Sequence, residues 1–378
     1  MPIAGQEMAP RASPGSRPPG DAAGSARALA VRMFMGMLAT QELLASYLGC
    51  RLGLYDSLSE DGPGTAAEIS ERTGVAPRYA REWLEQQAVA GLIAVEHPAR
   101  PADERVYAMP PGHAEVLTES ASPMSMIALT VLPLGGIARA LPELLAAYRS
   151  GAGVPDSVFG IDWRNGHSGA NRALFEHVLP GWIHRQLPAV HARLGSGGRV
   201  ADVACGAGYA SIALARAYPR AVIHGLDLDA ETIELATGAA AAAGVAERVT
   251  FEVRDAADPE LRGSYDLICL FDALHEIARP VEVLRSCRAL RKPGGEVLVM
   301  DAKVGTSFSA PGDEIERFQY GTSVLHCLPA CLAESPSAGT GTVMRVSAVR
   351  EFALAAGFGE LRLLPVEDRF HRLYQLVG

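Results

Sequence analysis

The most constraining feature of this sequence is a regular alternation of short β-branched runs and helical stretches, which begins after Gly198. Runs such as RVADVA, AVIHGLD and YDLICLF occur there, and two late strands are expected near Leu361–Val366 and Phe370–Val377. Strands that alternate with helices form βαβ units, in which a parallel sheet is covered on both faces. We therefore predict an α/β, doubly wound domain over residues 196–378, with its ligand beyond the carboxyl ends of the first strands.

Three further segments precede this domain, as expected for a chain of 378 residues, which exceeds the usual size of one domain. Residues 1–24 consist mostly of Pro, Gly, Ala and Ser, and we predict a disordered tail because they offer little apolar surface to offset ordering entropy. Residues 25–120 are expected to form a helical, winged-helix dimerisation domain. Residues 121–195 are expected to be a helical connector, in which Ala170–Leu187 is the longest helix and the scattered histidines lie at the surface or at helix caps.

The winged-helix prediction depends on residues 65 to 109. Thr65 and Glu68 form a capping-box pattern that starts a helix, and a second helix is expected to begin at Pro77. Two short strands around a Pro-rich loop follow. Helix, turn, helix and two-stranded wing are typical of DNA-binding domains, so a transcription regulator that senses a ligand is an alternative function.

The charge of the chain argues against nucleic acid as the partner. Asp and Glu (43) outnumber Lys and Arg (34), which gives a net charge of −9. The second helix carries acidic residues beside its arginines and therefore lacks the basic footprint that neutralises phosphates. We expect a homodimer instead, formed through the first long helix with the face that contains Leu43, Leu44, Tyr47 and Leu48.

Cysteine usage and hydropathy indicate the compartment. Six cysteines in 378 residues are too few for a disulfide framework. We expect no apolar stretch as long as a membrane span and no cleavable signal. The sequence therefore predicts a reduced, cytoplasmic enzyme that acts on a small molecule, without a membrane or nucleic-acid partner.

A glycine-rich loop follows the first strand of the α/β domain, in the run from Asp202 to Gly208 (DVACGAG). Glycines in such a turn let backbone amides approach a ligand next to a helix N-terminus. About twenty residues later the second strand ends in Asp227, where an acidic residue binds ribose hydroxyls. Another acidic residue, Asp255, lies at the end of the third strand.

Together these motifs resemble those of the class I S-adenosylmethionine-dependent methyltransferases. The resemblance implies that the loop holds the amino-acid portion of the cofactor, that Asp227 takes the ribose, and that Asp255 reaches the adenine amine. The cofactor-binding residues that it implies are Asp202, Ala204, Gly206, Gly208, Asp227, Leu228, Asp255, Ala256 and Phe271. Ala204 stands where the family usually has its first glycine. A nicotinamide enzyme is disfavoured, because Tyr209 and Ser211 do not supply its third glycine.

The fourth strand ends in a run that contains Leu274, His275, Glu276 and Ile277, and a Pro-Gly-Gly sequence follows before the fifth strand. This stretch is similar to the small-molecule O-methyltransferases with an N-terminal winged-helix dimerisation domain, whose motif there is Leu-His-Asp-Trp. The resemblance implies that His275 is the general base that removes a proton from a substrate hydroxyl. Ile277 occupies the place of the tryptophan.

A second histidine, His326, is flanked by apolar residues. With His275 and Glu276 it makes a candidate set of metal ligands and catalytic residues that leaves positions open for substrate. This arrangement looks like a smaller group of winged-helix methyltransferases that methylate the carbon next to the keto group of 2-oxo acids with a divalent or ferric metal.

We therefore expect S-adenosylmethionine and one Zn or Fe ion as cofactors, and metal-assisted C-methylation of a 2-oxo acid in specialised metabolism. The metal acts there as a Lewis acid. Metal-free O-methylation of a phenol or enol, with His275 as the base, is the alternative, and a methyltransferase fold recruited for other chemistry is a further one. Candidates for gripping a substrate carboxylate are Arg172, Tyr320 and Arg345.

Overall fold

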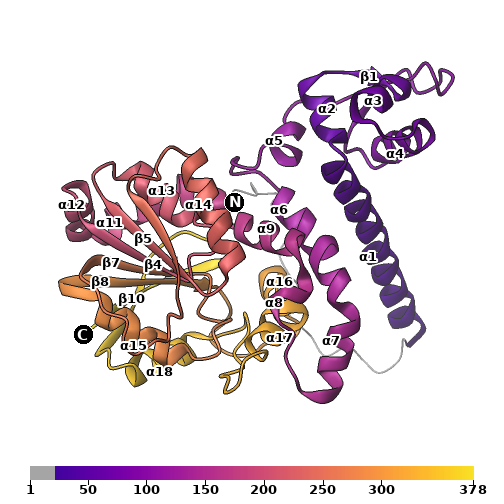
Figure 1. Ribbon diagram of the computed structural model, residues 1–378. Coiled ribbons are helices and arrows are strands. Elements are labelled where there is room, and N and C mark those ends of the chain that lie inside the picture. Colours follow the sequence, from indigo (N-terminus) through magenta and orange to yellow (C-terminus); the bar gives the residue numbers. More distant parts are fainter. Residues whose placement is uncertain (1–21) are drawn as a thin grey trace. The chain divides into compact units, whose positions relative to one another are not determined.

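The computed structural model describes residues 22–378, so most of the predicted tail over residues 1–24 lies outside the described residues. Ala22 already begins helix α1 (Ala22–Arg51). The chain divides into two compact units, Met1–Leu134 and Gly135–Gly378, whose elements are labelled in Figure 1. Residues 135–195 of the predicted connector therefore belong to the second unit.

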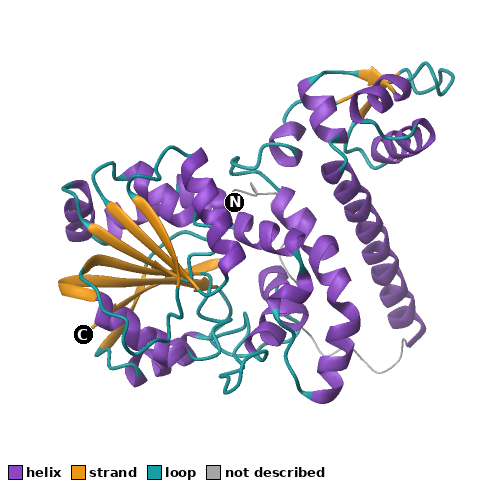
Figure 2. Ribbon diagram, in the orientation of Figure 1, coloured by secondary structure: helices purple, strands orange, loops and turns teal. Residues whose placement is uncertain are grey.

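The first unit combines helices with a small antiparallel sheet (Figure 2). The side chain of Thr65 accepts the backbone N–H of Glu68, and the Glu68 carboxylate accepts the N–H of Thr65 at 2.7 Å, so the capping box predicted for α3 is present. A third strand, which we did not predict, pairs Gly64 with Tyr107. After α1, the elements of the first unit are α2 (Leu54–Glu60), β1 (Gly64–Thr65), α3 (Ala66–Thr73), α4 (Pro77–Val89), β2 (Ala94–Glu96), β3 (Val106–Ala108), α5 (His113–Leu117) and α6 (Ile127–Val131).

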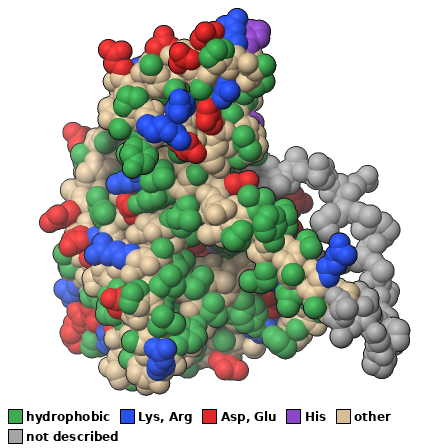
Figure 3. All heavy atoms as spheres, turned by 90° about the vertical axis from the view of Figure 1, so that its right-hand side faces the viewer, with side chains coloured by type: hydrophobic (Ala, Val, Ile, Leu, Met, Phe, Trp, Pro, Cys, Tyr) green, Lys and Arg blue, Asp and Glu red, His purple; other side chains and the backbone are tan. Residues whose placement is uncertain are grey.

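Helix α1 leaves many apolar side chains exposed, among them Met33, Phe34 and Leu48. Apolar side chains are prominent on the face drawn in Figure 3. The helical stretches Gly24–Arg51 and Ile127–Ser150 are long and apolar enough to cross a membrane, by length and composition alone. This corrects our expectation that no apolar stretch reaches that length, but core helices and signal sequences pass the same test.

The second unit contains a sheet with the strand order β6-β5-β4-β7-β8-β10-β9. The strands β4 to β8 pair in parallel, whereas β10 is antiparallel to both of its neighbours. The segment between β9 and β10 is too short for the crossover that parallel strands need, so these two strands pair antiparallel. The strands are β4 (Arg199–Val203), β5 (Val222–Asp227), β6 (Val249–Val253), β7 (Tyr265–Phe271), β8 (Arg291–Ala302), β9 (Glu360–Leu364) and β10 (His371–Val377).

Helices cover both faces of this sheet, and successive strand residues serve opposite faces. Val200 packs in one buried apolar cluster with residues of α13, whereas Ala201 packs in a second with residues of α15 and α18. The chain passes from β4 outward to β6 and then returns to β7 on the other side of β4. This reversal opens a crevice at the carboxyl ends of the strands. Among the covering helices are α13 (Tyr209–Ala217), α14 (Ala230–Ala242), α15 (Pro280–Leu290) and α18 (Val346–Ala355).

The helix predicted over Ala170–Leu187 is interrupted, which corrects that prediction. It is divided at Asn171 and at Val178. Pro180 accounts for the second break, because it has no N–H with which to continue the preceding helix. The helices of this region are η1 (Leu132–Ile137), α7 (Ala138–Ser150), α8 (Asp156–Phe159), α9 (Ile161–Ala170), α10 (Arg172–His177), α11 (Leu179–Gln186) and α12 (Pro188–Gly195). Later in the chain follow α16 (Glu314–Thr322), η2 (Ser323–Cys327) and α17 (Leu328–Cys331).

Candidate active site

A cavity of about 300 Å³ lies in the second unit, at the carboxyl ends of β4, β5, β6 and β7. Seven of the nine predicted cofactor-binding residues line it, and two, Asp202 and Gly208, are not among its lining residues. The seven are Ala204, Gly206, Asp227, Leu228, Asp255, Ala256 and Phe271. The predicted residues therefore converge on one cavity although they come from four separate strand ends.

The loop after β4 is held in a conformation that favours glycine. Ala204 has φ 53° and Gly206 has φ 52°, and both lie in the left-handed region. A residue with a Cβ is strained there, which explains why a glycine would be the ordinary choice at position 204. The backbone N–H of Gly206 donates to Oδ2 of Asp227 at 2.9 Å, so the loop is fastened to the end of β5.

Asp202 lies behind this loop. It is buried and accepts a hydrogen bond of 2.6 Å from the hydroxyl of Ser211 in α13. Burial raises the pKa of its carboxyl from 3.8 to about 6. Gly208 also has a packing role, because a Cβ there would lie 2.5 Å from the ring of Phe251. Both residues join α13 to the sheet.

The two acidic residues at the next strand ends do line the cavity. Asp227 accepts the backbone N–H groups of Gly206 and Asp229, but burial outweighs these bonds and raises its pKa above the ordinary value. Burial also acts to raise the pKa of Asp255, yet hydrogen bonds from Ala257 N (2.8 Å) and Arg279 (2.7 Å) lower it overall. Asp255 is therefore held as a carboxylate.

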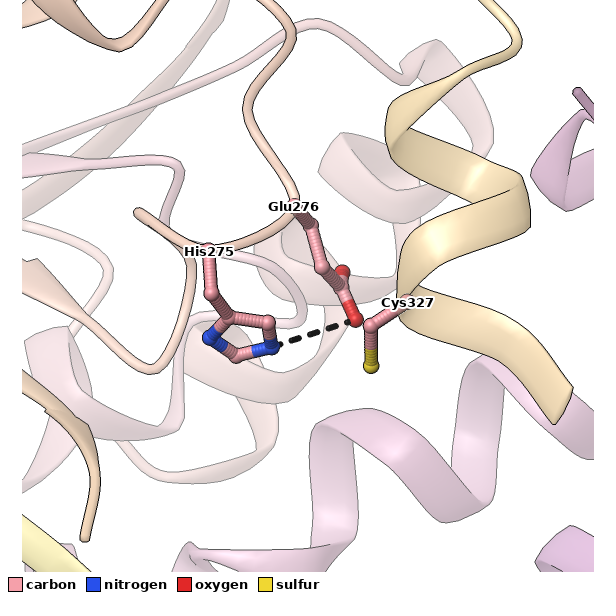
Figure 4. A group of neighbouring side chains, drawn as sticks. All are labelled: His275, Glu276 and Cys327. Carbon is pink, nitrogen blue, oxygen red and sulfur yellow. Dashed lines mark ion pairs between the residues drawn. The ribbon is translucent and has the colours of Figure 1, made fainter. Parts of the chain in front are cut away.

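His275 follows β7 and is almost fully buried. Its Nδ1 donates to Oδ1 of Asp301, on β8, at 2.8 Å. Its Nε2 lies 3.5 Å from Oε1 of Glu276, and Figure 4 shows this carboxylate between His275 and Cys327. Of these residues, only Glu276 lines the cavity.

His326 reaches the same carboxylate from η2, a short π-helix of the kind that often occurs at functional sites. Its Nδ1 lies 3.2 Å from Oε1 of Glu276, and its Nε2 lies 2.8 Å from Oδ1 of Asp156. The ring centroids of Trp163 and Phe159 lie 3.9 and 4.6 Å away from that of His326. The structure thus brings the predicted set His275, Glu276 and His326 together.

Two polar atoms at this point are buried and have no hydrogen-bond partner among the described residues: Oε1 of Glu276 and Nδ1 of His326. Burial acts to lower the pKa of His275 and of His326, but Asp301 and Glu276 respectively raise it well above the ordinary value. Burial acts to raise the pKa of Glu276, but the neighbouring histidines lower it. The cluster therefore carries opposite charges without complete hydrogen bonding.

The separation of each histidine nitrogen from Glu276 is that of neighbouring ligands in a metal centre. Ligands bound to one zinc ion at 2.0–2.1 Å lie roughly 3.3 Å apart in a tetrahedron, and the two histidine nitrogens lie 3.2 and 3.5 Å from Oε1 of Glu276. The outer nitrogen of each ring is paired with a carboxylate, Asp301 or Asp156, as is usual for histidines that bind metals. His275 and Glu276 therefore fit a metal ion, whereas His275, Glu276 and His326 do not form a group whose ligand atoms all lie within 4.8 Å of one another.

Two groups of donors meet this distance limit here. His275, Glu276 and Cys327 offer ligand atoms that all lie within 4.8 Å of one another, so Cys327 is an alternative ligand from η2. Asp272, His275 and Asp301 meet the same limit. In that group the hydrogen bond between His275 and Asp301 already accounts for their closeness.

Helix α9 supplies cavity residues that the sequence analysis missed, namely Trp163, Arg164 and His167. His167, expected at the surface or at a cap, has Nε2 3.7 Å from Oε1 of Glu276. Arg164 pairs with Asp229 at 2.9 Å. A signal was present in their spacing, because positions 163, 164 and 167 share one helical face.

The cavity wall is strongly acidic. Seven carboxylates line it, in Asp156, Asp227, Asp229, Asp255, Asp272, Glu276 and Glu334, against three guanidinium groups, in Arg164, Arg254 and Arg279. Each of these arginines forms an ion pair with a carboxylate. The predicted carboxylate-gripping residues Arg172, Tyr320 and Arg345 are not among the lining residues, and Arg345 pairs with Glu316 instead.

Comparison with known proteins assigns both parts of the chain. Residues 194–333 match the family described as "Methyltransferase domain", and residues 39–119 match the "Rv2258c-like winged HTH domain". This chain contains a methyltransferase domain. The methyltransferase domain holds β4 to β8 and the cavity loops, and the winged-helix prediction for the N-terminal part is likewise confirmed.

Relatives and solved structures agree with this domain assignment. The ubiquinone biosynthesis O-methyltransferase of Ralstonia nicotianae is 35% identical over 119 residues, which are 31% of this chain and 45% of that protein. The chain thus spans about half the length of the curated relatives that it matches. Mitomycin 7-O-methyltransferase has a TM-score of 0.68 at 20% identity, covering 94% of this chain and 99% of that structure. Human N-acetylserotonin methyltransferase, solved with S-adenosylmethionine, has 0.66 at 19%, covering 96% and 100%. The predicted class I methyltransferase fold is confirmed.

Proposed function

We propose that this chain transfers the methyl group of S-adenosylmethionine to a small organic acceptor. The proposal is supported by the seven predicted cofactor residues that line one cavity within the methyltransferase domain. The acidic wall also suits a cofactor that carries a sulfonium and an ammonium group. Asp227 would accept the ribose hydroxyls and Asp255 the adenine amine.

The acceptor that we propose is a 2-oxo acid, methylated at the carbon next to its keto group with the help of a metal ion. The observation that carries this proposal is the convergence of His275 Nε2 and His326 Nδ1 on Oε1 of Glu276, an oxygen without a hydrogen-bond partner among the described residues. A zinc or iron ion held by these three residues would polarise the keto group as a Lewis acid.

The residues of this chain prepare that step by positioning. Asp301 and Asp156 hold the outer nitrogens of the two histidines, so that the inner nitrogens face Glu276. Glu276 lines the cavity and connects the cluster to the cofactor side. The acceptor carbon gives up its proton to solvent water and forms a bond to the methyl carbon as the carbon–sulfur bond breaks, which leaves S-adenosylhomocysteine. Alignment of the two reactants supplies much of the acceleration.

O-methylation of a phenol or enol is the second candidate, and the buried His275–Asp301 hydrogen bond favours it. Burial acts to lower the pKa of His275, but the neighbouring carboxylates raise it, so the ring must first lose a proton. Its Nδ1–H bond to Asp301 then leaves Nε2 unprotonated, as a general base requires. In this reaction the acceptor hydroxyl loses its proton to His275 and its oxygen takes the methyl group. No metal takes part.

Elemental analysis followed by methyl-transfer assays distinguishes metal-assisted C-methylation from metal-free O-methylation. For C-methylation we expect about one metal ion per chain, loss of turnover on chelation, and methylation of aryl or alkyl 2-oxo acids rather than phenols. His326→Ala should then lose both metal and activity. A metal-free protein that is fully active on phenols would establish the general-base reaction instead.

We also propose that the chain is a homodimer in which the exposed apolar side chains of α1 are covered by a second copy. Light scattering of the purified protein should give twice the chain mass.

A gel-shift at low salt tests the regulator alternative, for which specific nanomolar DNA binding is required. The cytoplasmic location stays a prediction.

A further inference from the structure

Three donor atoms of different elements lie close enough together to hold one ion: a ring nitrogen of His275, a carboxylate oxygen of Glu276 and Sγ of Cys327. All three lie within 4.8 Å of one another, and Nε2 of His275 is 3.5 Å from Oε1 of Glu276. Ligands of one tetrahedral zinc ion lie roughly 3.3–3.6 Å apart, a spacing that small side-chain movements would give these donors. We infer that Cys327, in place of His326, is the third ligand of the metal centre, an inference that rests on the metal site of the proposed function.

His326 and Cys327 are adjacent on η2, and adjacent residues of a helix do not face the same way. Figure 4 shows the side chain of Cys327 beside the Glu276 carboxylate. The ring of His326 is held elsewhere, because it lies against Trp163 with centroids 3.9 Å apart and its Nε2 pairs with Asp156 at 2.8 Å. His326 belongs to neither donor group found in the described part of the chain. It is therefore an outer partner, with Nδ1 3.2 Å from Oε1 of Glu276.

The charge of the ligand set also favours Cys327. A carboxylate and a thiolate together neutralise the two charges of Zn²⁺, whereas two neutral imidazoles and one carboxylate leave a net positive charge. A net charge is costly in a buried site, and both His275 and Cys327 are at most 2% exposed. An ion between the three donors would also give a partner to Oε1 of Glu276, which is buried and has none among the described residues.

The set of one nitrogen, one oxygen and one sulfur specifies the class of metal. A thiolate ligand favours Zn²⁺ over Mg²⁺ and Ca²⁺, which take oxygen ligands. Because the thiolate rather than the thiol binds metal, Cys327 releases its proton to solvent when the ion binds. Three protein ligands leave the fourth position of a tetrahedral ion open. Glu276 lines the cavity, so the acceptor would reach that position from there.

The test is titration of the metal-free full chain with Co²⁺, in competition with a chelator of known affinity. A thiolate bound to Co²⁺ gives an intense charge-transfer absorption in the near ultraviolet, which imidazole and carboxylate ligands lack. We expect this band in the unmodified chain. Cys327→Ser should lose the band and should weaken Co²⁺ binding by at least the 10-fold to 100-fold that loss of an outer partner of a metal ligand costs.

Two further variants separate a ligand from an outer partner. His326→Ala should weaken Co²⁺ binding by about 10-fold to 100-fold but keep the band. Cys331→Ser is the matched control and should keep both the affinity and the band, because its thiol is equally buried on α17 and lies 3.7 Å from the carbonyl oxygen of Ile277. X-ray absorption of the zinc-loaded unmodified chain needs no variant and should show one sulfur at about 2.3 Å.

The outcomes distinguish this inference from the proposed function beneath it. If the unmodified chain binds Co²⁺ without a thiolate band, or if Cys327→Ser keeps the band, the role of Cys327 is overturned and the metal centre stands. A zinc ion with only nitrogen and oxygen neighbours would overturn that role in the same way. If the unmodified chain binds no Co²⁺, the metal centre itself fails.

Discussion

The imidazole of His275 donates a 2.8 Å hydrogen bond to Asp301, and both side chains are at most 2% exposed. Asp301 also accepts the backbone N–H of His275 at 3.3 Å, so one carboxylate fixes both the loop and the ring. Nε2 is thereby directed at Glu276. The pair is required in either proposed reaction, because a base and a metal ligand both need this tautomer.

Asp301→Asn tests that requirement. The asparagine amide can donate to Nδ1 and so favour the wrong tautomer, in which Nε2 carries the proton. We expect metal affinity to fall about 10-fold to 100-fold and methyl transfer to fall with it. Metal titration and turnover assays measure the two effects, and a variant with unchanged affinity and rate would contradict the proposed function of the pair.

Asp227→Asn tests the proposed ribose site. The substitution keeps the shape of the side chain but removes the charge that accepts hydrogen bonds at this strand end. Hydrogen bonds to a charged group contribute roughly 1.5–3 kcal/mol, so we expect the affinity for S-adenosylhomocysteine to fall about 10-fold to 100-fold, measured by calorimetry. Glu234→Gln, on the exposed side of α14, is the control and should bind normally. Unchanged binding in Asp227→Asn would show that the ribose lies elsewhere.

Asp202 should give the chain a stability that depends on pH. Burial raises its pKa from 3.8 to about 6 in the folded chain, so between about pH 4 and pH 6 the folded state holds a proton that the unfolded state releases. The free energy of unfolding therefore decreases as pH rises through this window, by roughly 3 kcal/mol from this group.

Asp202→Asn cannot ionise and should remove that contribution. The free energy of unfolding of the variant minus that of the unmodified chain should therefore increase between pH 4 and pH 7. Urea denaturation at several pH values measures this difference. A difference that stays constant, or decreases with pH, would refute the buried-carboxyl interpretation.

Ala204→Gly tests the strained loop. A left-handed residue with a Cβ costs roughly 1–2 kcal/mol, whereas a new glycine adds unfolded-state entropy of about 0.5–1 kcal/mol. We expect the free energy of unfolding to rise by up to about 1 kcal/mol. Ala241→Gly, on the exposed end of α14, should instead lower it by about 1 kcal/mol. Chemical denaturation of the two variants gives both values, and equal losses would contradict the assigned backbone strain.

Most of the fold and half of the candidate site could be predicted from local sequence patterns. The ends of β4, β5 and β6 could be predicted because each is a short apolar run followed by a turn, and parallel strands present those ends at one edge. Asp227 and Asp255 could therefore be placed at the strand ends, and both line the cavity. Asp202 did not, because its side chain belongs to the packing between β4 and α13, which spacing alone does not reveal.

The other half of the site depends on contacts between distant segments. His167 precedes Glu276 by more than a hundred residues, in a region where the sequence shows only helices punctuated by Pro and Gly. The approach of α9 to the cavity is set by tertiary packing. His275 and His326 could be paired from the sequence through a resemblance, whereas His167 and Trp163 had only a weak helical spacing.

The excess of carboxylates around the cavity has a consequence for encounter kinetics. An anion that diffuses toward the cavity is repelled, whereas a cation is attracted. S-adenosylmethionine and any metal ion should therefore bind before an acidic acceptor. Added salt screens repulsion over distances of about 10 Å at 0.1 M. Capture of the acid would then quicken as ionic strength rises, the reverse of the usual behaviour of electrostatically guided enzymes.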